Sequence, residues 1–568
     1  MNILGISFLS DASACLIKDG KIIAAVSEER INRKKLWNGI PRKSIEKVLD
    51  IAGINMSNID YIATHGTNLK EPDYDAFKFS EEKIKSSNLS ERLKKIQLKA
   101  LDERYQKELK IIAERTPEYI EEIKKLNKKT FVYEHHQAHA STAFFGSGWD
   151  ESYVLTADGW GEDGSNSFWS GNGIYIDKIS YSPTIDSLGY FYGSITKSLG
   201  FTPHRHEGKI LGLAAYDTKQ ESYKTIKKMI SFDSEKNKFS GDLFKGIYKP
   251  TYENNELDKA ISGFTREDVA SSTQRRLEEV VFEFLSNIDD TKIQISLAGG
   301  VFANVKLNQR IKDHPNVSDV YVFPNMGDGG LSIGAAWLAY TEITNKKPDA
   351  LNTALLGTSV SDSKILSELK KTKLFYKKKT NINLEIAKLI SRGEVVIRVS
   401  GKMEFGPRAL GNRSILCEAT DSSVNTWLNQ YLNRSEFMPF APMTLGDDVD
   451  KFYFNIDGGT SPAKYMAMTF DCTQKMIDEA PATVHVDNTA RPQFITEDDY
   501  PEMYEVLSEY KNLTGLSNII NTSFNMHEEP IVSSELDAIN SFIKSGIKWM
   551  ALGNYLVKNI NQEISPKS

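Results

Sequence analysis

Three times in this chain a short apolar run, long enough for one buried strand, passes directly into a turn of small residues. The segments are residues 2–11, 153–159 and 293–304. Small residues and glycine let the backbone approach a ligand closely, and a helix that begins after such a turn attracts anions with its first N–H groups. The pattern predicts an α/β fold in which the ends of separate strands form ligand-binding turns.

A pair of histidines indicates one such ligand. His135 and His139 are four residues apart, so on a helix their imidazoles lie on one face, one turn from each other. Taken alone, such a pair is more often solvated at a helix end. Here Asp158 follows an apolar strand, and Asp328 lies in a second Asp-Gly turn far downstream. Imidazoles combined with carboxylates suit a divalent transition metal, so we predict a metal site.

Length and composition are those of a globular protein with two domains. At 568 residues the chain exceeds what one hydrophobic core usually organises. Its formal net charge of −6 gives no support for bulk attraction to nucleic acid or to an anionic membrane. Cys15, Cys417 and Cys472 have no metal-ligand spacing. No apolar stretch reaches membrane-spanning length and the start lacks a signal peptide, so we expect a cytoplasmic protein.

Two changes in character along the chain predict its domains. Residues 80–128 are rich in Lys and Glu, lack glycine and have apolar residues at helical spacing, which indicates two amphipathic helices inserted into the first domain. Near 345–349 the sequence becomes linker-like, and basic runs follow. We predict a first domain at 1–345, a linker at 346–375 and a second domain at 376–568.

The second domain contains a loop with the composition of an anion pocket. After a strand at 394–399, residues 401–414 combine glycine and proline with Lys402, Arg408 and Arg413. A guanidinium can hold two phosphate oxygens at once, and small residues let the backbone approach them. A surface ion pair is the commoner role of a single arginine, but these two arginines lie among small and apolar residues. Further polar candidates follow downstream: Arg434, Arg491, Ser523 and Asn525.

With these segments assembled, the chain resembles the O-carbamoyltransferases of the nodulation-protein and nebramycin/cephamycin type over essentially its whole length. That family joins an N-terminal domain of the actin, heat-shock ATPase and sugar-kinase (ASKHA) class, similar to the threonylcarbamoyl-tRNA transferase subunit, to an α+β YrdC-like domain. The resemblance is carried, in the family's order, by Gly5-Ile6, Asp11-Ala12-Ser13-Ala14, Ser27-Glu28-Glu29-Arg30, His135-His136-Gln137-Ala138-His139-Ala140, Asp158-Gly159, Glu207-Gly208-Lys209, Gly299-Gly300-Val301-Phe302-Ala303-Asn304, Gly327-Asp328, residues 403–414, Pro439-Phe440-Ala441-Pro442, Arg491-Pro492-Gln493 and Asn521-Thr522-Ser523-Phe524-Asn525.

The resemblance implies two linked reactions. The YrdC-like domain uses ATP, with Mg²⁺, to convert carbamoyl phosphate into carbamoyl adenylate and releases pyrophosphate. The first domain then transfers the carbamoyl group to a hydroxyl, with Fe(II) or a similar divalent metal as Lewis acid and template. The acceptor is a sugar or other small metabolite, or a hydroxymethyl-pyrimidine in DNA. No membrane partner is expected, and a homodimer is left open.

Carried over residue by residue, the resemblance assigns a role to each candidate. The implied metal ligands are His135, His139, Asp158 and Asp328. The implied carbamoyl phosphate and ATP contacts in the second domain are Lys402, Arg408, Arg413, Arg434, Arg491, Ser523 and Asn525. The implied border of the nucleotide site in the first domain is Glu207, Gly299, Gly300 and Asn304, and the catalytic candidates are Ser10, Asp11 and Lys209.

One departure from the family concerns the general base. The family usually has a histidine just before the Asp-Ala-Ser-Ala turn, where this chain has Ser10. A serine does not deprotonate an alcohol at neutral pH, so another group has to act on the acceptor hydroxyl. The candidates are Asp11, His204 and His206.

Other functions stay open from the sequence alone. A catalytically impaired regulatory or binding homologue would account for Ser10 and for Leu432 and Met438, which replace two cations of the family; Lys402 is a candidate to compensate. Threonylcarbamoyl or hydrogenase-maturation chemistry is a second possibility; the order of domains and the lack of zinc-ligand cysteines count against hydrogenase maturation. An actin-like small-molecule kinase would leave residues 390–560 without a role. We therefore predict an ATP-dependent O-carbamoyltransferase.

Overall fold

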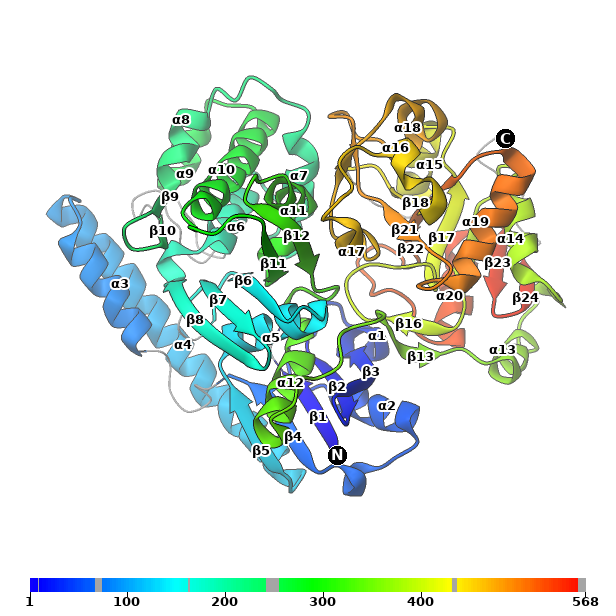
Figure 1. Ribbon diagram of the computed structural model, residues 1–568, viewed down its shortest axis with the longest axis horizontal. Coiled ribbons are helices and arrows are strands. Elements are labelled where there is room, and N and C mark those ends of the chain that lie inside the picture. Colours follow the sequence, from blue (N-terminus) through cyan, green and yellow to red (C-terminus); the bar gives the residue numbers. More distant parts are fainter. Residues whose placement is uncertain (9, 67–73, 162–163, 242–254, 432–436, 560–568) are drawn as a thin grey trace. The chain divides into compact units, whose positions relative to one another are not determined.

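The structure is a computed structural model that describes residues 1–8, 10–66, 74–161, 164–241, 255–431 and 437–559. The chain divides into two compact units (Figure 1). The first comprises Met1–Ile22, Asn38–Pro41 and Gly53–Leu351, and the second comprises Ile23–Trp37, Arg42–Ala52 and Asn352–Ser568. Two short segments near the N-terminus therefore group with the C-terminal part of the chain.

A five-stranded sheet of order β3-β2-β1-β4-β5 belongs to the first unit except for most of β3, which starts in the first unit and groups with the second from Ile23 onward. β1 pairs antiparallel with β2 and parallel with β4, which in turn pairs parallel with β5. β1 and β2 are buried along almost their whole length, which explains their continuously apolar sequences. The strands are β1 (Asn2–Ser7), β2 (Ser13–Lys18), β3 (Lys21–Ser27), β4 (Tyr61–His65) and β5 (Lys129–Tyr133).

A second five-stranded sheet of the first unit has the order β12-β11-β6-β7-β8. β6 pairs antiparallel with β7 and parallel with β11, which pairs parallel with β12. The strands are β6 (Glu151–Ala157), β7 (Asn166–Asn172), β8 (Tyr175–Ser182), β11 (Ile293–Ala298) and β12 (Val317–Val322). The two sheets thus share one topology: a central strand, an antiparallel hairpin on one side and two parallel strands on the other.

This repeated topology decides where a ligand can bind. In each sheet the three parallel strands end at the same edge, and open α/β sheets bind ligands beyond the carboxyl ends of their strands. Each sheet also leads into a helix at that edge: α5 (His135–Ser147) follows β5 and α12 (Leu331–Thr344) follows β12. These two helices pack against each other (Figure 1). The strand-end turns predicted from the sequence lie at these edges.

Two helices lie between β4 and β5, where the sequence predicts an insertion. They are α3 (Tyr74–Ser86) and α4 (Glu91–Lys125), which run side by side (Figure 1, blue). The side chain of Ser90 accepts the N–H of Leu93 and so caps α4. Buried side chains of both helices meet Ile185, and Lys83 forms an ion pair with the buried Asp186. The insertion is therefore anchored to the first unit by an apolar cluster and one charge pair.

The remaining elements of the first unit cover the second sheet and extend beside it. α10 is the longest of these helices and packs against α6, α7, α8 and α11. The elements are α6 (Leu188–Ser198), α7 (Glu207–Ala214), α8 (Tyr223–Ile226), β9 (Ile230–Asp233), β10 (Lys238–Gly241), α9 (Asn255–Ile261), α10 (Arg266–Ser286) and α11 (Val305–Lys312).

The second unit is organised around an eight-stranded mixed sheet of order β14-β24-β23-β15-β17-β22-β18-β21. β13 and β16 form a separate two-stranded sheet, as do β19 and β20. The strands are β13 (Leu355–Ser359), β14 (Phe375–Lys378), β15 (Val396–Val399), β16 (Lys402–Glu404), β17 (Arg413–Glu418), β18 (Ala441–Leu445), β19 (Phe470–Asp471), β20 (Thr489–Ala490), β21 (Gln493–Ile495), β22 (Asn518–Ser523), β23 (Trp549–Leu552) and β24 (Tyr555–Lys558).

Helices α14 and α19 pack against each other in the second unit. Their apolar residues, such as Ile386 and Val506, share one buried cluster with strand residues such as Val396 and Ile519, which gives this unit its core. The helices are α1 (Glu28–Asn32), α2 (Arg42–Ala52), α13 (Asp362–Leu369), α14 (Ile382–Ile390), α15 (Ser423–Tyr431), α16 (Val449–Phe452), α17 (Thr460–Ala463), α18 (Gln474–Glu479), α19 (Pro501–Thr514) and α20 (Glu535–Ser545).

The prediction of a mixed α/β fold is confirmed by this architecture. The domain limits at 345, 346–375 and 376–568 stay a prediction. Among the described residues, no helix is both long and apolar enough to cross a membrane.

Candidate functional site

Four predicted metal ligands converge in the first unit. We call His135, His139, Asp158 and Asp328 the His/Asp cluster; one potential ligand atom from each lies within 4.8 Å of the others. The histidines come from the first turns of α5, Asp158 from the residue after β6, and Asp328 from the turn between β12 and α12. Residues almost 200 positions apart thus meet because the carboxyl ends of strands from both sheets lie beside the cluster.

The distances within the cluster suit a common ligand better than direct hydrogen bonds. Nε2 of His139 lies 3.3 Å from Asp158 Oδ2 and 3.6 Å from Asp328 Oδ1. Nε2 of His135 lies 3.6 Å from each of the same two oxygens. For bonds of about 2.1 Å to a tetrahedral ion, neighbouring ligand atoms are about 3.4 Å apart. The spacing therefore fits two nitrogen and two oxygen ligands of one divalent ion.

Buried polar atoms without partners support the same conclusion. Within the described part of the chain, Nε2 of His139 and Oδ2 of Asp158 are buried and form no hydrogen bond. A buried polar group without a partner costs free energy, so native proteins usually satisfy it with protein, water or an ion. The donor set, two imidazoles and two carboxylates, is one that divalent transition metals accept. The residues present fit a metal.

The two carboxyl groups of the cluster differ in acidity. Burial acts to raise the pKa of Asp158, but the adjacent imidazoles of His135 and His139 outweigh it and hold this pKa well below its usual range. Burial, followed by the negative charge of Asp158, raises the pKa of Asp328. Two carboxylates at one place repel each other, and a shared cation would relieve that repulsion.

Backbone contacts fix the turns that carry the aspartates. The hydroxyl of Ser187 donates to the carbonyl of Asp158 at 2.8 Å. The hydroxyl of Ser7, at the end of β1, donates to the carbonyl of Asp328 at 3.0 Å. Nε2 of His65 lies 3.0 Å from the same hydroxyl, and the His65 ring packs edge-on against His135 at 5.5 Å. Sequence analysis missed His65, although it is the polar end of an apolar strand.

The third histidine of the run has a different role. His136 is fully buried, and its ring nitrogens are engaged outside the cluster: they lie 3.0 Å from the hydroxyl of Thr156 and 3.1 Å from the carbonyl of Gly164. Burial and the two neighbouring histidines lower its pKa well below the usual value, so it is neutral. His136 therefore links α5 to the strands beside it.

Two predicted nucleotide-site glycines adjoin the cluster. Gly299 has a φ of 107°, and a Cβ there would lie 2.1 Å from the carbonyl oxygen of Ala157, so only glycine fits against the end of β6. A Cβ on Gly300 would lie 3.1 Å from Oδ1 of Asp158. The turn after β11 is therefore directly beside the Asp158 carboxylate.

The other predicted residues of the first nucleotide site are held locally. Asn304 caps α11 by accepting the N–H of Leu307 at 3.0 Å, and its amide pairs with that of Gln274. Glu207 accepts the N–H of His204 at 2.6 Å, and burial raises its pKa. Lys209 lies over the Phe201 ring at 5.8 Å. Glu207 and Lys209 belong to the first turn of α7.

Among the candidate bases, Asp11 lies close to the turn that carries Asp328. It has a φ of 54°, and a Cβ on Gly327 would be 4.0 Å from its Oδ2. Ser10 is exposed. His206 accepts the N–H of Thr202, and His204 has a φ of 65° in the same turn before α7. Geometry thus favours Asp11 among the four residues.

The two arginines of the predicted anion loop in the second unit differ in burial and in their contacts. Arg408 is half-buried, whereas Arg413 is fully buried at the start of β17. The Arg413 guanidinium donates to the carbonyls of Ser400 and Asn412 at 2.7 Å, of Thr358 at 3.1 Å and of Ser533 at 3.3 Å. Burial lowers its pKa to about 10. Its donors are engaged by the backbone, so Arg413 acts in this structure as a framework residue.

The remaining second-unit candidates are placed as follows. Lys402 is exposed and Arg491 is half-buried. The hydroxyl of Ser523 donates to Oδ1 of Asn525 at 2.6 Å, so these two side chains share a face as the sequence predicts. Met438 is half-buried. The predictions on Arg434 and Leu432 lie outside the described residues.

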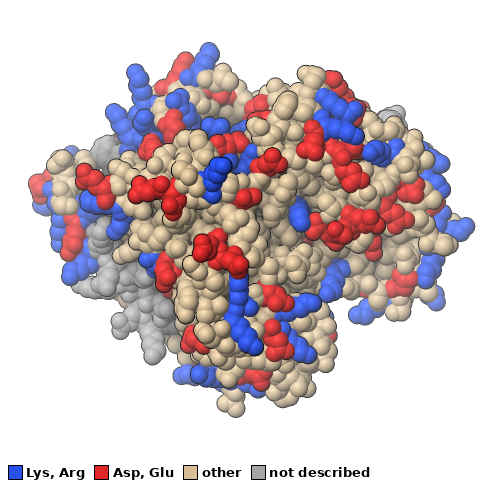
Figure 2. Space-filling view, in the orientation of Figure 1, with Lys and Arg blue, Asp and Glu red and all other residues tan. Residues whose placement is uncertain are grey.

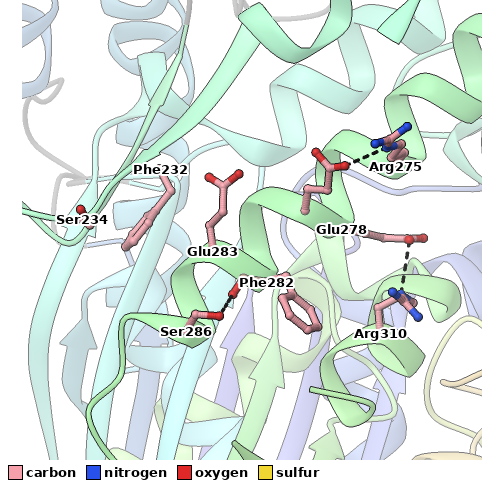
Figure 3. Close-up of a pocket in the computed structure, with 9 residues that line it drawn as sticks. Phe232, Ser234, Arg275, Glu278, Phe282, Glu283, Ser286 and Arg310 are labelled. Carbon is pink, nitrogen blue, oxygen red and sulfur yellow. Dashed lines mark hydrogen bonds and ion pairs between the residues drawn. The ribbon is translucent and has the colours of Figure 1, made fainter. Parts of the chain in front are cut away.

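A surface groove elsewhere on the first unit contains none of the predicted site residues (Figure 3). Phe232 and residues of α10 and α11 line it. Its charges are paired with each other: Arg275 bonds Glu279 at 2.7 Å, and Arg310 lies 3.6 Å from Glu278. On the face drawn in Figure 2, acidic and basic side chains are likewise interspersed. Neither feature indicates a second charged binding site.

Comparison with known proteins covers both units. Two family profiles match: Carbamoyltransferase N-terminus over residues 2–337 and Carbamoyltransferase C-terminus over residues 387–559. The uncharacterized protein MJ1051 of Methanocaldococcus jannaschii is 33% identical over 98% of this chain and 100% of its own length. Nodulation protein NolNO of Sinorhizobium fredii is 31% identical over 97% of this chain and 79% of its own length.

Solved structures are more distant. Component A of (R)-2-hydroxyglutaryl-CoA dehydratase from Acidaminococcus fermentans has a TM-score of 0.34 and 14% identity, over 60% of this chain and 98% of that chain. The two profile matches and the full-length relatives define a group-transfer enzyme. The chain belongs to the carbamoyltransferase family, and it transfers carbamoyl groups.

Proposed function

We propose that this enzyme is an ATP-dependent O-carbamoyltransferase. Carbamoyl phosphate, water and ATP give carbamoyl adenylate, phosphate and pyrophosphate in the second unit. A hydroxyl then attacks the carbonyl carbon of the adenylate, AMP leaves, and the acceptor keeps the carbamoyl group. The observation that carries the transfer step is the convergence of the His/Asp cluster on ligand spacing.

The first unit provides the transfer site. His135, His139, Asp158 and Asp328 would hold a divalent transition metal, for which iron(II) is our proposal. When bound, such an ion stabilises negative charge on the carbonyl oxygen as the tetrahedral centre forms. Asp11 is the group we place nearest to the acceptor hydroxyl, since its carboxylate adjoins the Asp328 turn.

The repeated sheet topology supports an actin-like first domain. The glycine turn after β11 and the first turn of α7 would border the nucleotide end of the adenylate, through Gly299, Gly300, Glu207, Lys209 and Asn304. Backbone N–H groups at such a turn can approach phosphate, because a side chain at Gly299 is excluded. The aromatic ring of Phe201, over which Lys209 lies, would help to exclude water from the site.

The second unit would activate the carbamoyl group as a YrdC-like domain. We assign carbamoyl phosphate and ATP contacts to Arg408, Arg491, Lys402, Ser523 and Asn525. A guanidinium can hold phosphate oxygens two at a time. We assign Arg413 to the framework beneath them, because its donors already bond four backbone carbonyls.

We propose a sugar or other small-metabolite hydroxyl as the acceptor. The net charge is −6, and the insertion helix α4 carries both signs of charge along its length, which gives no positive track for a nucleic acid backbone. A hydroxymethyl-pyrimidine in DNA is the alternative acceptor, and a direct test can distinguish it from a small-molecule hydroxyl.

The test uses the full-length protein loaded with iron(II). It is incubated with carbamoyl phosphate, ATP, Mg²⁺ and separate panels of sugars, other alcohols and hydroxymethylated DNA, and products are analysed by mass spectrometry. A mass gain of one carbamoyl group on a sugar or small alcohol, with AMP and pyrophosphate formed, supports the proposal. If hydroxymethylated DNA gains the carbamoyl group and no sugar or alcohol does, the acceptor is the pyrimidine in DNA.

A parallel assay checks the activation step. Exchange of labelled pyrophosphate into ATP, dependent on carbamoyl phosphate, is expected without any acceptor. Absence of exchange in folded, metal-loaded enzyme would overturn the adenylate route, whereas transfer without ATP would indicate a direct reaction with carbamoyl phosphate.

A further inference from the structure

The loop at residues 405–412, which we call the arginine loop, belongs to no helix or strand, although it carries Arg408. Its flanks are β16 and β17. A segment without ladder hydrogen bonds has to satisfy its backbone groups in another way, or remain mobile. Buried side chains of the second unit bond backbone groups of the loop at Gly406 and from Ala409 to Asn412, on both sides of Arg408.

Its N–H groups converge on one carboxylate oxygen. Oε1 of Glu404 accepts the N–H of Leu410 at 2.8 Å, of Asn412 at 2.8 Å and of Arg413 at 3.1 Å. The hydroxyl of Ser414 accepts the N–H of Gly411 at 3.0 Å. Because Glu404 is only 1% exposed, it binds these N–H groups out of competition with water.

Its carbonyl groups are held from the large sheet beneath. Asn521 on β22 donates to the carbonyl of Ala409 at 2.9 Å, and Gln493 on β21 donates to that of Leu410 at 3.1 Å. The two amides also bond each other at 3.1 Å. Both side chains are almost completely buried. The loop is thereby tied to two strands of the large sheet, β22 and β21, which flank β18.

Buried arginines complete the arrangement. The guanidinium of Arg398 donates to the carbonyl of Gly411 at 2.8 Å, and Arg30 donates to that of Gly406 at 2.6 Å. The carboxylate of Glu404 supplies a negative charge next to Arg398 and Arg413. Removing one member would leave a buried charge or carbonyl uncompensated, so the group acts as a unit.

We propose that Glu404, Gln493 and Asn521 are positioning residues that hold the arginine loop in a preformed shape, so that Arg408 is already oriented for the phosphate of carbamoyl phosphate. The inference rests on the proposed activation step. A preformed loop avoids the entropy loss of ordering the arginine at binding, which improves affinity without a new ligand contact. None of the three residues has to touch the substrate.

The decisive experiment is a double-mutant cycle in the full-length enzyme. Gln493→Met removes the donor to the Leu410 carbonyl with little change in volume, and Arg408→Ala removes the proposed phosphate contact. We expect Gln493→Met alone to raise KM for carbamoyl phosphate about 10- to 100-fold in pyrophosphate exchange, because small misplacements of binding groups have effects of that size. In the Arg408→Ala background, Gln493→Met should add less than about twofold.

A matched control separates positioning from loss of stability. Asp448 is a buried carboxylate of the same unit that bonds Lys451, Lys511 and Ser517, none of them in the loop. Asp448→Asn should lower the melting temperature but leave KM for carbamoyl phosphate unchanged. Glu404→Gln, which retains an acceptor oxygen for the three N–H groups, should preserve more affinity than Glu404→Ala.

Hydrogen exchange supplies a readout that does not depend on activity. The amides of Leu410, Asn412 and Arg413 should exchange slowly in the unliganded wild type and at least about tenfold faster in Gln493→Met. Fast exchange of these amides in the wild type would overturn the proposal, as would additive effects of Gln493→Met and Arg408→Ala. Slow exchange in a wild type that lacks pyrophosphate exchange would instead contradict the proposed activation step and leave the rigidity of the loop established.

Discussion

The His/Asp cluster and the arginine loop are both built from buried polar groups, but they are completed in opposite ways. In the cluster, Nε2 of His139 and Oδ2 of Asp158 are buried without a hydrogen bond in the described part of the protein. In the loop, the guanidinium of Arg413 and the N–H groups from Leu410 to Arg413 bond other protein groups. The spacing of the first arrangement fits an ion, whereas most groups of the second bond other protein groups. Within the described residues, Oε2 of Glu404 and Oδ1 of Asn521 are buried atoms of the second arrangement that form no hydrogen bond.

This difference indicates how to distinguish, among residues of one chemical type, those that would bind an ion or a substrate from those that stabilise the fold. Arg408 and Arg413 lie five positions apart in the same motif, yet Arg413 is fully buried with its guanidinium surrounded by backbone carbonyls, whereas Arg408 is half-buried. His136 and His139 lie in one helical turn, yet His136 bonds Thr156 and Gly164 while His139 faces two carboxylates. Paired substitutions within each motif test this distinction.

The largest expected effect is on the cluster. His139→Ala should lower the rate of carbamoyl transfer about a thousandfold, because it removes one ligand of the proposed ion, which would stabilise the developing charge. Pyrophosphate exchange in the second unit should be retained. Metal content, measured by elemental analysis, should fall with the transfer rate. Transfer at the wild-type rate would disprove the metal role of this residue.

His136→Gln is the matched control in the same helical turn. It should lower thermal stability, since His136 is fully buried, but it should retain the metal. Added iron(II) at about 100 times its dissociation constant should stabilise both the wild type and His136→Gln by about 2.7 kcal/mol. The same addition should leave His139→Ala almost unchanged in a thermal scan.

The next effect is on stability. Arg413→Met should lower the free energy of unfolding by about 3 kcal/mol, because several buried carbonyls lose their donor. Arg408→Met should change it by less than about 1 kcal/mol, as expected for a half-buried side chain. Urea unfolding of the full-length protein measures both values. Equal losses would remove the distinction between the two arginines.

A somewhat smaller effect concerns activation. Arg408→Ala should reduce carbamoyl-phosphate-dependent pyrophosphate release about a hundredfold, since a charge-assisted phosphate contact is lost in the activation step. Transfer from chemically prepared carbamoyl adenylate should continue at a rate close to that of the wild type. Undiminished pyrophosphate release would show that the phosphate pocket lies elsewhere.

The smallest expected effect is the pH dependence of the stability that Asp448 contributes to the second unit. Burial acts to raise the pKa of Asp448, but its bonds from Lys451, Lys511 and Ser517 outweigh it and hold this pKa below the usual range. The folded pKa is therefore lower than the unfolded value of about 3.9. The stability that the carboxylate contributes is fully present above about pH 3.9 and is lost as the pH falls from there through the folded pKa.

Unfolding measured at pH 7 and at about pH 3 should show the consequence. Wild type and Asp448→Asn should differ by up to about 2 kcal/mol at pH 7, and the difference should narrow toward pH 3. A difference that is constant over this range would mean that the carboxylate charge does not stabilise the fold.

Sequence patterns predicted the strand ends well, because burial on both sides leaves a continuous apolar run that is visible without any tertiary information. β1, β6 and β11 end where their apolar runs end, and α5 begins at His135. The resemblance to the carbamoyltransferases correctly gave the family. Polar residues whose partners are distant received no role from sequence patterns. His65 at the end of β4 was not singled out, and Glu404, Gln493 and Asn521 around the arginine loop lie in matching motifs without an assigned role.

The amino-acid sequence by itself determined the local elements and the chemical types available at their ends, because hydrophobic periodicity and turn residues act over a few positions. Only the tertiary structure decided which of those groups meet. It brought His139 to Asp328 across almost 190 residues by ending two parallel strand sets near one place, and it enclosed Arg413 in backbone carbonyls while leaving Arg408 half-exposed. The hydrogen bonds that a buried side chain finds depend on distant segments, and that is why its role could not be read from its own motif.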